Sequence, residues 1–303
     1  MASTASSASG AAKKIVVAGG NGFLGTRICK YAVARGWDVV SLSRSGEPSW
    51  SSVTSSPQPP PWAKDVSWMK ADILKPSTYT KHLEGTYAVV HTMGILLEAD
   101  YKGVVSGKES PISGLRRAFS STKQGSVRNP LEKGEEQSGD DGIGIGETDG
   151  QITYELMNRD SAISLATEAT ARDVSTFAYI SAAAGAPILP ARYITTKREA
   201  ESMLSSNFPQ LRSLFFRPGF LYDSSRAFTI PIMAAGMVGN TVNQWLFQGG
   251  LTRVFGASVE KPLKADLVAE AVVEGIAEED VKGVQQTRDI EALAAKAWRR
   301  GML

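Results

Sequence analysis

The chain has 303 residues, of which 42% are hydrophobic, enough for the core of one large α/β domain or two modest ones. Its 33 basic and 31 acidic residues leave a net charge of +2, which gives no global attraction to nucleic acid. One cysteine, Cys29, and two histidines exclude an internal disulfide and the usual zinc sites, and no apolar stretch reaches the roughly 18 residues of a membrane-spanning helix.

The first 12 residues are rich in serine and alanine and contain neither an acidic residue nor an arginine. Mitochondrial targeting segments normally carry arginines, so this one is a weak candidate. We therefore expect residues 1–12 to be a disordered N-terminus or a weak targeting segment outside the fold. From these residues alone, cytoplasmic and mitochondrial locations both stay open.

A short apolar run at 15–18 predicts a strand, and a glycine-rich segment follows it. Apolar periodicity over 26–35 predicts a helix that leads to a second strand at 38–43, which completes a β-α-β unit. The G-x-x-G-x-x-G spacing lets the backbone approach a pyrophosphate, while the helix N-terminus turns free N–H groups toward the anion. The alternative is a glycine turn in a fold that has lost its ligand. The residues expected to contact a dinucleotide are Gly19, Asn21, Gly22, Phe23, Leu24 and Gly25.

The end of the second strand bears on the choice between NAD(H) and NADP(H). An acidic side chain there would bond to the ribose 2′-hydroxyl, but the chain has Ser43, Arg44 and Ser45 instead. Arg44 is a planar, permanently charged donor that suits a phosphate, so we predict NADP(H) in preference to NAD(H). The alternative is a solvated arginine at the start of a loop, and the prolines and serines of 45–62 predict such a loop.

Two further strands are predicted at 66–69 and 87–91, with their carboxyl ends at the edge where the cofactor should lie. Asp72 suits the adenine amino group. His91 ends a strand that looks buried and has no acidic partner nearby in the sequence, so we favour a structural role for it. The expected cofactor contacts from these strand ends are Asp72, Ile73, Thr92 and Gly94.

An acidic segment separates this half of the chain from the next. Residues 132–150 hold seven acidic residues, one lysine and six glycines. Such a composition buries too little apolar surface to offset the entropy of ordering the backbone. We expect a disordered surface insertion at about 120–150.

After the insertion, a helix over 152–172 and a strand over 176–180 lead to Ser181. Tyr193 and Lys197 lie four residues apart at the start of a charged helix, so they share one helical face. A neighbouring lysine lowers the pKa of a phenol and also bonds to the nicotinamide ribose, and Ser181 would orient a substrate carbonyl. We predict Ser181, Tyr193 and Lys197 as the catalytic residues. The alternative is a cofactor-binding pair without turnover.

The C-terminal part is expected to select a substrate or partner. Residues 227–252 contain no charged side chain, but glycines, amides and a proline interrupt their apolar run. We predict a pocket lining or interfacial helix that accepts an isoprenoid-like lipid, with an ordinary buried helix as the alternative. An amphipathic helix follows at 266–277. A last basic helix, ending at Trp298-Arg299-Arg300, would either touch an anionic membrane surface or cap the fold.

Taken in chain order, the glycine motif, Ser181, the Tyr193-x-x-x-Lys197 pair and the run Arg217-Pro218-Gly219 resemble the short-chain dehydrogenase/reductase family of extended or atypical type. The resemblance spans roughly residues 13–280. It implies an α/β, doubly wound parallel-sheet Rossmann fold over 13–225 with a small C-terminal capping region over 226–303. It also implies that Pro218 contacts the cofactor.

More local runs resemble the branch of this family that serves fungal mitochondrial ubiquinone biosynthesis and is similar to the NADPH-binding accessory subunit of respiratory complex I. That branch implies the matrix face of the mitochondrial inner membrane, a protein complex there as partner, and an isoprenoid quinone precursor or lipid as ligand. The expected function is NADPH-dependent redox of that precursor; the alternative is a non-catalytic assembly or regulatory subunit. An epimerase or dehydratase of nucleotide sugars is disfavoured, because the uncharged stretch offers little to a sugar diphosphate. The runs lie at 20–25, 93–96, 157–160, 179–182 and 216–222.

Overall fold

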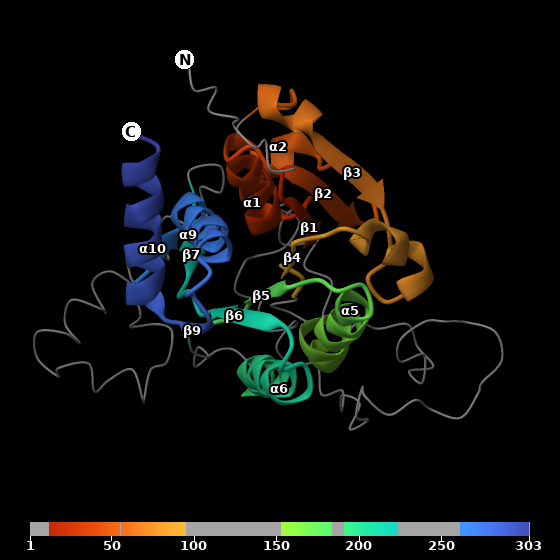
Figure 1. The fold of residues 1–303 in the computed structure, drawn as a ribbon. Helices are drawn as coiled ribbons and strands as arrows, with labels where there is room; N and C mark the ends of the chain where they lie inside the picture. Colours follow the sequence, from red (N-terminus) through yellow and green to blue (C-terminus); the bar gives the residue numbers. More distant parts are fainter. Residues whose placement is uncertain (1–11, 55, 95–152, 184–190, 224–260, 303) are drawn as a thin grey trace, which may run out of the picture.

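The computed structural model describes residues 12–54, 56–94, 153–183, 191–223 and 261–302 (Figure 1). Within these residues, seven strands form one sheet in the order β3-β2-β1-β4-β5-β6-β9, and every neighbouring pair is parallel. The strands are β1 (Lys14–Ala18), β2 (Asp38–Ser43), β3 (Val66–Lys70), β4 (Ala88–His91), β5 (Thr176–Ile180), β6 (Arg212–Phe216) and β9 (Gly283–Gln285).

The strand order shows that the sheet is doubly wound. The chain runs outward from β1 to β3, returns to place β4 on the other side of β1, and then continues to β9. The order therefore reverses between β1 and β4. In open parallel sheets, ligands bind at the carboxyl ends of the strands on either side of such a reversal. The predicted Rossmann fold is confirmed.

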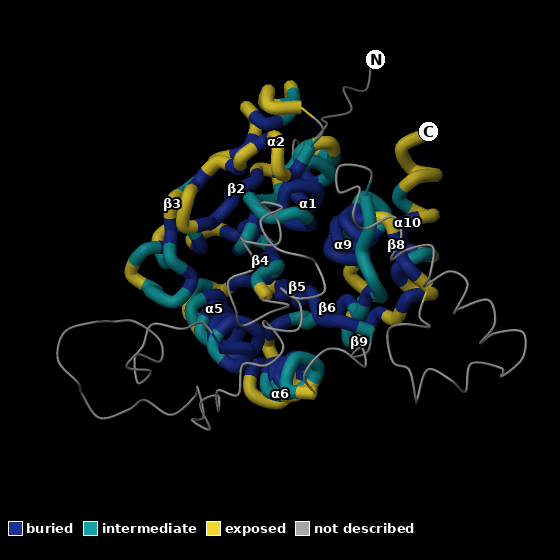
Figure 2. Tube along the Cα trace, turned by 180° about the vertical axis from the view of Figure 1, so that it is seen from behind, coloured by how far each residue is buried: buried dark blue, intermediate teal, exposed yellow. Residues whose placement is uncertain are grey.

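Helices cover both faces of the sheet. Ile15 and Val17 of β1 pack in one buried cluster with residues of α1 and α9, whereas Val16 and Ala18 pack in another with residues of α5 and α6. Figure 2 shows the central strands largely in dark blue, as buried, whereas the edge strand β3 is mostly teal and yellow. Because both faces are covered, the strand is apolar throughout rather than alternating. The helices are α1 (Phe23–Ala34), α2 (Trp50–Val53), α5 (Ser161–Thr170), α6 (Ala191–Asn207), α9 (Ala265–Ala277) and α10 (Thr287–Arg300).

The predicted loop at 45–62 is more ordered than its composition suggested. It contains α2 and the start of the 3₁₀ helix Pro61–Asp65, and the rings of Trp50, Trp62 and Trp68 pack together with centroids 5.7 to 6.5 Å apart. The prediction of an irregular loop was wrong here, because three aromatic side chains spread over 19 positions provide a small core of their own.

Several predictions lie outside the described residues. These concern the N-terminal segment up to residue 11, the acidic insertion and the uncharged stretch 227–252. In the part of the chain that the structure describes, no helix is both long and apolar enough to cross a bilayer. The same residues contain no cluster of histidine, cysteine or acidic side chains able to hold a metal ion.

The C-terminal helices are joined to the end of α1 through a buried carboxylate. Glu274 of α9 is fully buried, and its oxygens lie 2.5 Å from Nη1 of Arg35 on α1 and 2.9 Å from Nη2 of Arg300 on α10. A two-stranded sheet of β7 (Leu221–Tyr222) and β8 (Leu263–Lys264) leads into α9. The three helices thus form one layer over the sheet.

Replacing Glu274 by glutamine should lower the free energy of unfolding by about 2 kcal/mol, because it leaves the Arg35 guanidinium without its carboxylate, whereas Arg300 keeps its ion pair with Glu278. Urea titration followed by circular dichroism measures this. Glu291→Gln is the matched control: Glu291 pairs with Lys261 on the surface, and we expect a change below about 0.5 kcal/mol. Equal effects of the two substitutions would contradict the role given to Glu274.

Candidate functional site

The glycine loop leaves β1 at the point where the strand order reverses. Gly19 has a φ of +82°, and a β-carbon there would lie 2.6 Å from Oγ1 of Thr92. At Gly25, in the first turn of α1, a β-carbon would lie 2.2 Å from the carbonyl oxygen of Gly19. The helix therefore packs directly against the loop, as the predicted dinucleotide motif requires.

A fourth glycine in this loop was missed by the sequence reasoning. A β-carbon at Gly20 would lie 2.3 Å from Oγ of Ser41 on β2, so the loop is also pressed against the neighbouring strand. The amide of Asn21 donates to Oγ of Ser45 over 2.6 Å and joins the loop to the turn after β2. Leu24 turns its side chain into the core, which leaves its backbone as the part available to a ligand.

The turn after β2 presents the predicted phosphate-binding arginine. Oγ of Ser43 donates to the carbonyl of Gly46 over 2.8 Å and accepts from its N–H over 3.0 Å, so Ser43 holds the turn rather than a ligand. Arg44 is exposed at the turn, and no described residue bonds to its guanidinium. Lys70, which ends β3 in register with Ser43, lies against Gly46, with Cγ 3.2 Å from where a β-carbon would be. Two exposed cations therefore flank this turn.

The other predicted cofactor contacts lie along the same edge. Oδ1 of Asp72 accepts from the N–H of Leu74 over 3.1 Å, which fixes the carboxylate in a local turn, and Ile73 is buried beside it. Thr92 donates its hydroxyl to the carbonyl of Ala18 over 2.8 Å and so ties β4 to β1. Thr92 therefore packs against the start of the glycine loop and leaves no room for a side chain at Gly19.

Gly94 lies where two polar side chains meet. A β-carbon on Gly94 would lie 3.2 Å from Oδ1 of Asn158 and 3.3 Å from Nζ of Lys197. The ammonium of Lys197 donates to the carbonyl of Ile180 over 3.0 Å, and the side chain is buried. Burial lowers the pKa of Lys197 to about 8, with the Glu201 carboxylate acting in the opposite direction. The structure thus brings β4, β5 and α6 together around one buried cation.

The environment of the Tyr193 phenol differs from the one that its spacing to Lys197 suggested. Burial raises the pKa of the Tyr193 phenol to about 12, and the charge that lowers it is that of Arg198. Nζ of Lys197 lies 5.8 Å from the centre of the Tyr193 ring, and its hydrogen bond goes to a backbone carbonyl. Four-residue spacing places the two side chains on one face, but burial of the phenol has the largest effect on its pKa.

Ser181 directly follows β5, as predicted, but its hydroxyl bonds to an arginine and not to the tyrosine. Nη1 of Arg198 donates to Oγ of Ser181 over 2.9 Å. Pro218, at the end of β6, accepts from the N–H of Ala183 through its carbonyl over 2.8 Å and so fixes the neighbouring backbone. The arginine that follows Lys197 in the sequence is therefore part of the site, which spacing alone did not indicate.

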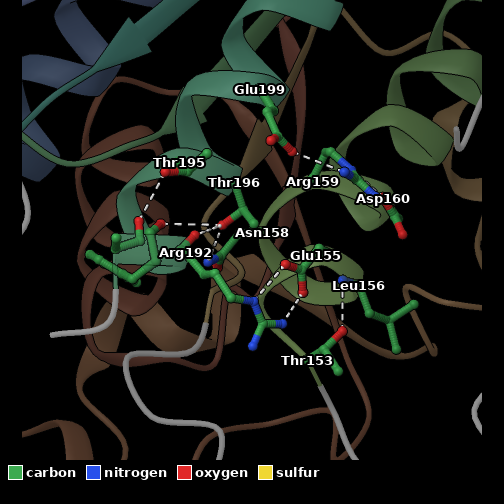
Figure 3. A network of polar contacts seen from close by, with 12 residues as sticks. Thr153, Glu155, Leu156, Asn158, Arg159, Asp160, Arg192, Thr195, Thr196 and Glu199 are labelled. Carbon is green, nitrogen blue, oxygen red and sulfur yellow. Dashed lines mark hydrogen bonds and ion pairs between the residues drawn. The ribbon is translucent and has the colours of Figure 1, made fainter. Parts of the chain in front are cut away.

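Asn158 is a second residue that the sequence reasoning left out. It lies on the π-helix Glu155–Asp160, a distortion that is frequent at functional sites, and its side chain is fully buried. Its amide donates to Oγ1 of Thr196 over 3.3 Å. Figure 3 shows how ion pairs from Arg192 to Glu155 and from Arg159 to Glu199 lock this π-helix to α6. The extra backbone residue of a π-turn has no hydrophobic signature, so the pattern predicted an ordinary helix.

His91 is fully buried and bonded to Ser161, contacts that fit the structural role which the sequence favoured. Its Nε2 lies 2.9 Å from Oγ of Ser161, which donates its own hydrogen to the carbonyl of Met157, so Nε2 carries the ring proton. Complete burial, together with the Lys197 charge, lowers the pKa of His91 to about 3. The ring of His91 is therefore neutral throughout the physiological range, and it lies inside the protein.

Titration of the two histidines by NMR tests this. Between pH 5 and 8 we expect the ring signals of His91 to stay constant and to report the Nε2-protonated form. Those of His82, which is partly exposed, should shift within the same spectra. Movement of the His91 signals over this range would contradict a purely structural role.

Comparisons with known proteins agree with this geometry. The sequence model of the NAD dependent epimerase/dehydratase family matches residues 15–100. Component 2 of the MIOREX complex of Saccharomyces cerevisiae is 34% identical over 293 residues, which cover 91% of this chain and 98% of the yeast protein. An uncharacterized chloroplastic protein of Arabidopsis thaliana is 23% identical over 290 residues, covering 94% of this chain and 78% of the plant protein.

Solved structures share the fold at low identity. A UDP-N-acetylglucosamine 4-epimerase from Methanobrevibacter ruminantium M1 is similar with a TM-score of 0.51 at 15% identity, over 91% of this chain and 76% of the epimerase. The terminal R domain of the myxalamid biosynthetic pathway is similar with a TM-score of 0.52 at 16% identity, over 92% of this chain and 66% of that domain. These likenesses show the Rossmann-type fold alone.

Proposed function

Because this chain belongs to the NAD-dependent epimerase/dehydratase family of short-chain dehydrogenase/reductase-like proteins, we propose that it is an NADP(H)-dependent oxidoreductase of a hydrophobic quinone precursor. The observation that carries the proposal is the buried ammonium of Lys197, four residues after Tyr193 and at the edge where the strand order reverses. A buried cation lowers the stability of the fold, and a site with a strongly shifted pKa in such a place is a candidate for chemistry.

The residues present fit a dinucleotide. The glycine loop excludes side chains at three positions, and the N-terminus of α1 faces the space above it with free N–H groups. The bound cofactor would supply or accept the hydride. Lys197 would bond to its ribose, Tyr193 would exchange a proton with the substrate oxygen, and Ser181 would donate a hydrogen bond to that oxygen.

The proposal is tested with purified protein, NADPH and 9,10-phenanthrenequinone as an aromatic quinone probe. We expect NADPH oxidation by the unmodified chain and at least about a 100-fold loss of kcat in Tyr193→Phe. Unchanged turnover in Tyr193→Phe would reject the role of the tyrosine. NADPH binding without turnover of the probe or of isoprenoid quinone precursors would favour the second candidate function.

That second candidate is a nucleotide-bound assembly or regulatory subunit. It is favoured by the relative that matches over nearly its whole length, which is named as a component of a complex. In cells that lack the protein, Gly22→Asp and Tyr193→Phe chains separate the two functions. Recovery of quinone content by Tyr193→Phe but not by Gly22→Asp would show that binding matters and turnover does not. For either function we propose the matrix face of the mitochondrial inner membrane as the location.

The preference for NADP(H) rests on the two cations beside the turn after β2. Arg44 follows the last residue of β2 and Lys70 ends β3, both next to the predicted adenosine ribose, and no described acidic residue pairs with either. We expect Arg44→Met and Lys70→Met each to weaken NADPH binding by about tenfold or more, because a charge-assisted bond to phosphate is lost. NADH affinity should change less than about twofold.

Fluorescence titration of the reduced nicotinamide measures both affinities. Lys64→Met, which removes an exposed lysine from the helix Pro61–Asp65, is the matched control and should bind NADPH normally. Equal affinities of the unmodified protein for NADPH and NADH would defeat the proposed preference.

A further inference from the structure

The guanidinium of Arg198 spans the end of β5. Nη1 donates to Oγ of Ser181 over 2.9 Å and to Oε1 of Glu201 over 2.8 Å. Nη2 donates to the carbonyls of Ala182 and Ala183 over 2.7 and 2.9 Å. Four of its five N–H groups are used, which leaves little of this arginine for a substrate. Its role is to hold the strand end in place.

The Glu201 carboxylate binds a second arginine besides Arg198. The same buried carboxylate also accepts from Arg217 at the end of β6, through Nε over 3.1 Å and through Nη2. Two guanidinium groups share one carboxylate, so a net positive charge is kept at this edge. Burial lowers the pKa of Arg198, which shows that the position has an energetic cost for the cation.

The contact also settles which way the Ser181 hydroxyl bonds. A guanidinium can only donate, so Oγ of Ser181 is the acceptor and its own hydrogen is left for another partner. No described residue accepts that hydrogen. Donation from a cation into the oxygen also strengthens the hydroxyl as a donor, because hydrogen bonds in a chain polarise one another.

We propose that Arg198 is a positioning residue of the site: it holds Ser181 with the hydroxyl hydrogen free for the carbonyl oxygen of a substrate, and it keeps a positive charge on the helix that carries Tyr193. This inference rests on the proposed function. Lys197 donates to the carbonyl of Ile180, and Arg198 donates to the next three residues, 181–183. Two consecutive cations of α6 therefore hold the end of β5.

The first test is a double-mutant cycle with NADPH and 9,10-phenanthrenequinone on the full chain. Arg198→Met and Ser181→Ala should each lower kcat by about tenfold or more with KM unchanged. The kcat of the double variant should be no lower than that of the less active single variant. Losses that multiply in the double variant would overturn the proposal, as would an unchanged kcat in Arg198→Met.

Two further variants separate positioning from folding. Arg198→Lys keeps the charge but cannot span a serine and two carbonyls, so it should show the same loss of kcat with an unchanged melting temperature. Arg172→Met removes a cation that pairs with Glu168 after α5, at the opposite edge of the sheet, and should leave kcat unchanged. Full activity in Arg198→Lys would mean that charge alone matters and would overturn the hold on Ser181.

A second measurement tests the effect of the Arg198 charge on the Tyr193 phenol, and it needs no turnover of substrate. 3-Fluorotyrosine at position 193 reports the ionisation of the phenol by ¹⁹F NMR, and Arg198→Met should raise its midpoint by about one pH unit, with Arg198→Lys and Arg172→Met unchanged. An unmoved midpoint in Arg198→Met overturns this half of the proposal, whereas absent NADPH binding or turnover overturns only the proposed function. The groups near this phenol are Tyr154, Glu155, Tyr179, Arg192, Lys197, Arg198 and Glu201.

Discussion

Replacement of Gly25 by alanine is expected to lower the affinity for NADPH at least about 100-fold, which corresponds to about 2.7 kcal/mol. A β-carbon at this position would lie 2.2 Å from the carbonyl oxygen of Gly19 and 2.8 Å from Cα of Gly20. Both are backbone atoms, so no side-chain rotation relieves the clash. The helix N-terminus must move away from the loop, and the N–H groups that should face the pyrophosphate move with it.

Gly301→Ala is the matched control, because a β-carbon there would have its nearest neighbours at 3.6 and 3.8 Å. Gly22→Asp separates binding from folding. Gly22 caps α1 with an extended backbone, φ −81° and ψ 176°, where aspartate is a favourable cap, but its carboxylate would repel a phosphate. We expect a folded Gly22→Asp chain that does not bind NADPH. Binding by Gly25→Ala within about threefold of normal would contradict the assigned role of the loop.

The fold was predictable because its signals are local. The residues of β1 are buried on both faces, so the strand reads as a continuous apolar run, and the glycines that follow have no room for a side chain. The strand predicted at 15–18 lies within β1, and that predicted at 176–180 coincides with β5. Where the carboxyl ends of parallel strands must meet at one edge, topology alone brings the predicted residues into one region.

The chemistry of the site was less predictable, because it depends on burial and on contacts between elements. The spacing of Tyr193 and Lys197 indicates a shared helical face, but it does not indicate that burial raises the pKa of the phenol to about 12. The bond from Arg198 to Ser181 depends on how α6 lies against β5. Spacing along one chain contains no information on that approach, and Arg198 would otherwise be interpreted as a solvated residue.

Replacement of Lys197 by methionine is expected to stabilise the ligand-free protein at neutral pH while it weakens NADPH binding by about tenfold or more. Burial lowers the pKa of Lys197 from 10.5 to about 8, and this difference corresponds to about 3 kcal/mol of penalty on the charged form. Loss of the hydrogen bond to the carbonyl of Ile180 offsets about 1 kcal/mol of the gain. A net gain of about 2 kcal/mol in the free energy of unfolding should therefore appear at pH 7.

The stability gained by Lys197→Met should depend on pH. Below about pH 8 the lysine is protonated in both the folded and the unfolded chain, so the full penalty is present. Between about pH 8 and 10.5 the folded chain releases the proton first, and the unmodified protein gains stability as the pH rises. The advantage of Lys197→Met should thus shrink toward zero near pH 10, as measured by urea unfolding at several pH values. A lower stability of Lys197→Met at pH 7 would show that the ammonium is a structural support of the fold, and the argument for a functional cation at this site would fail.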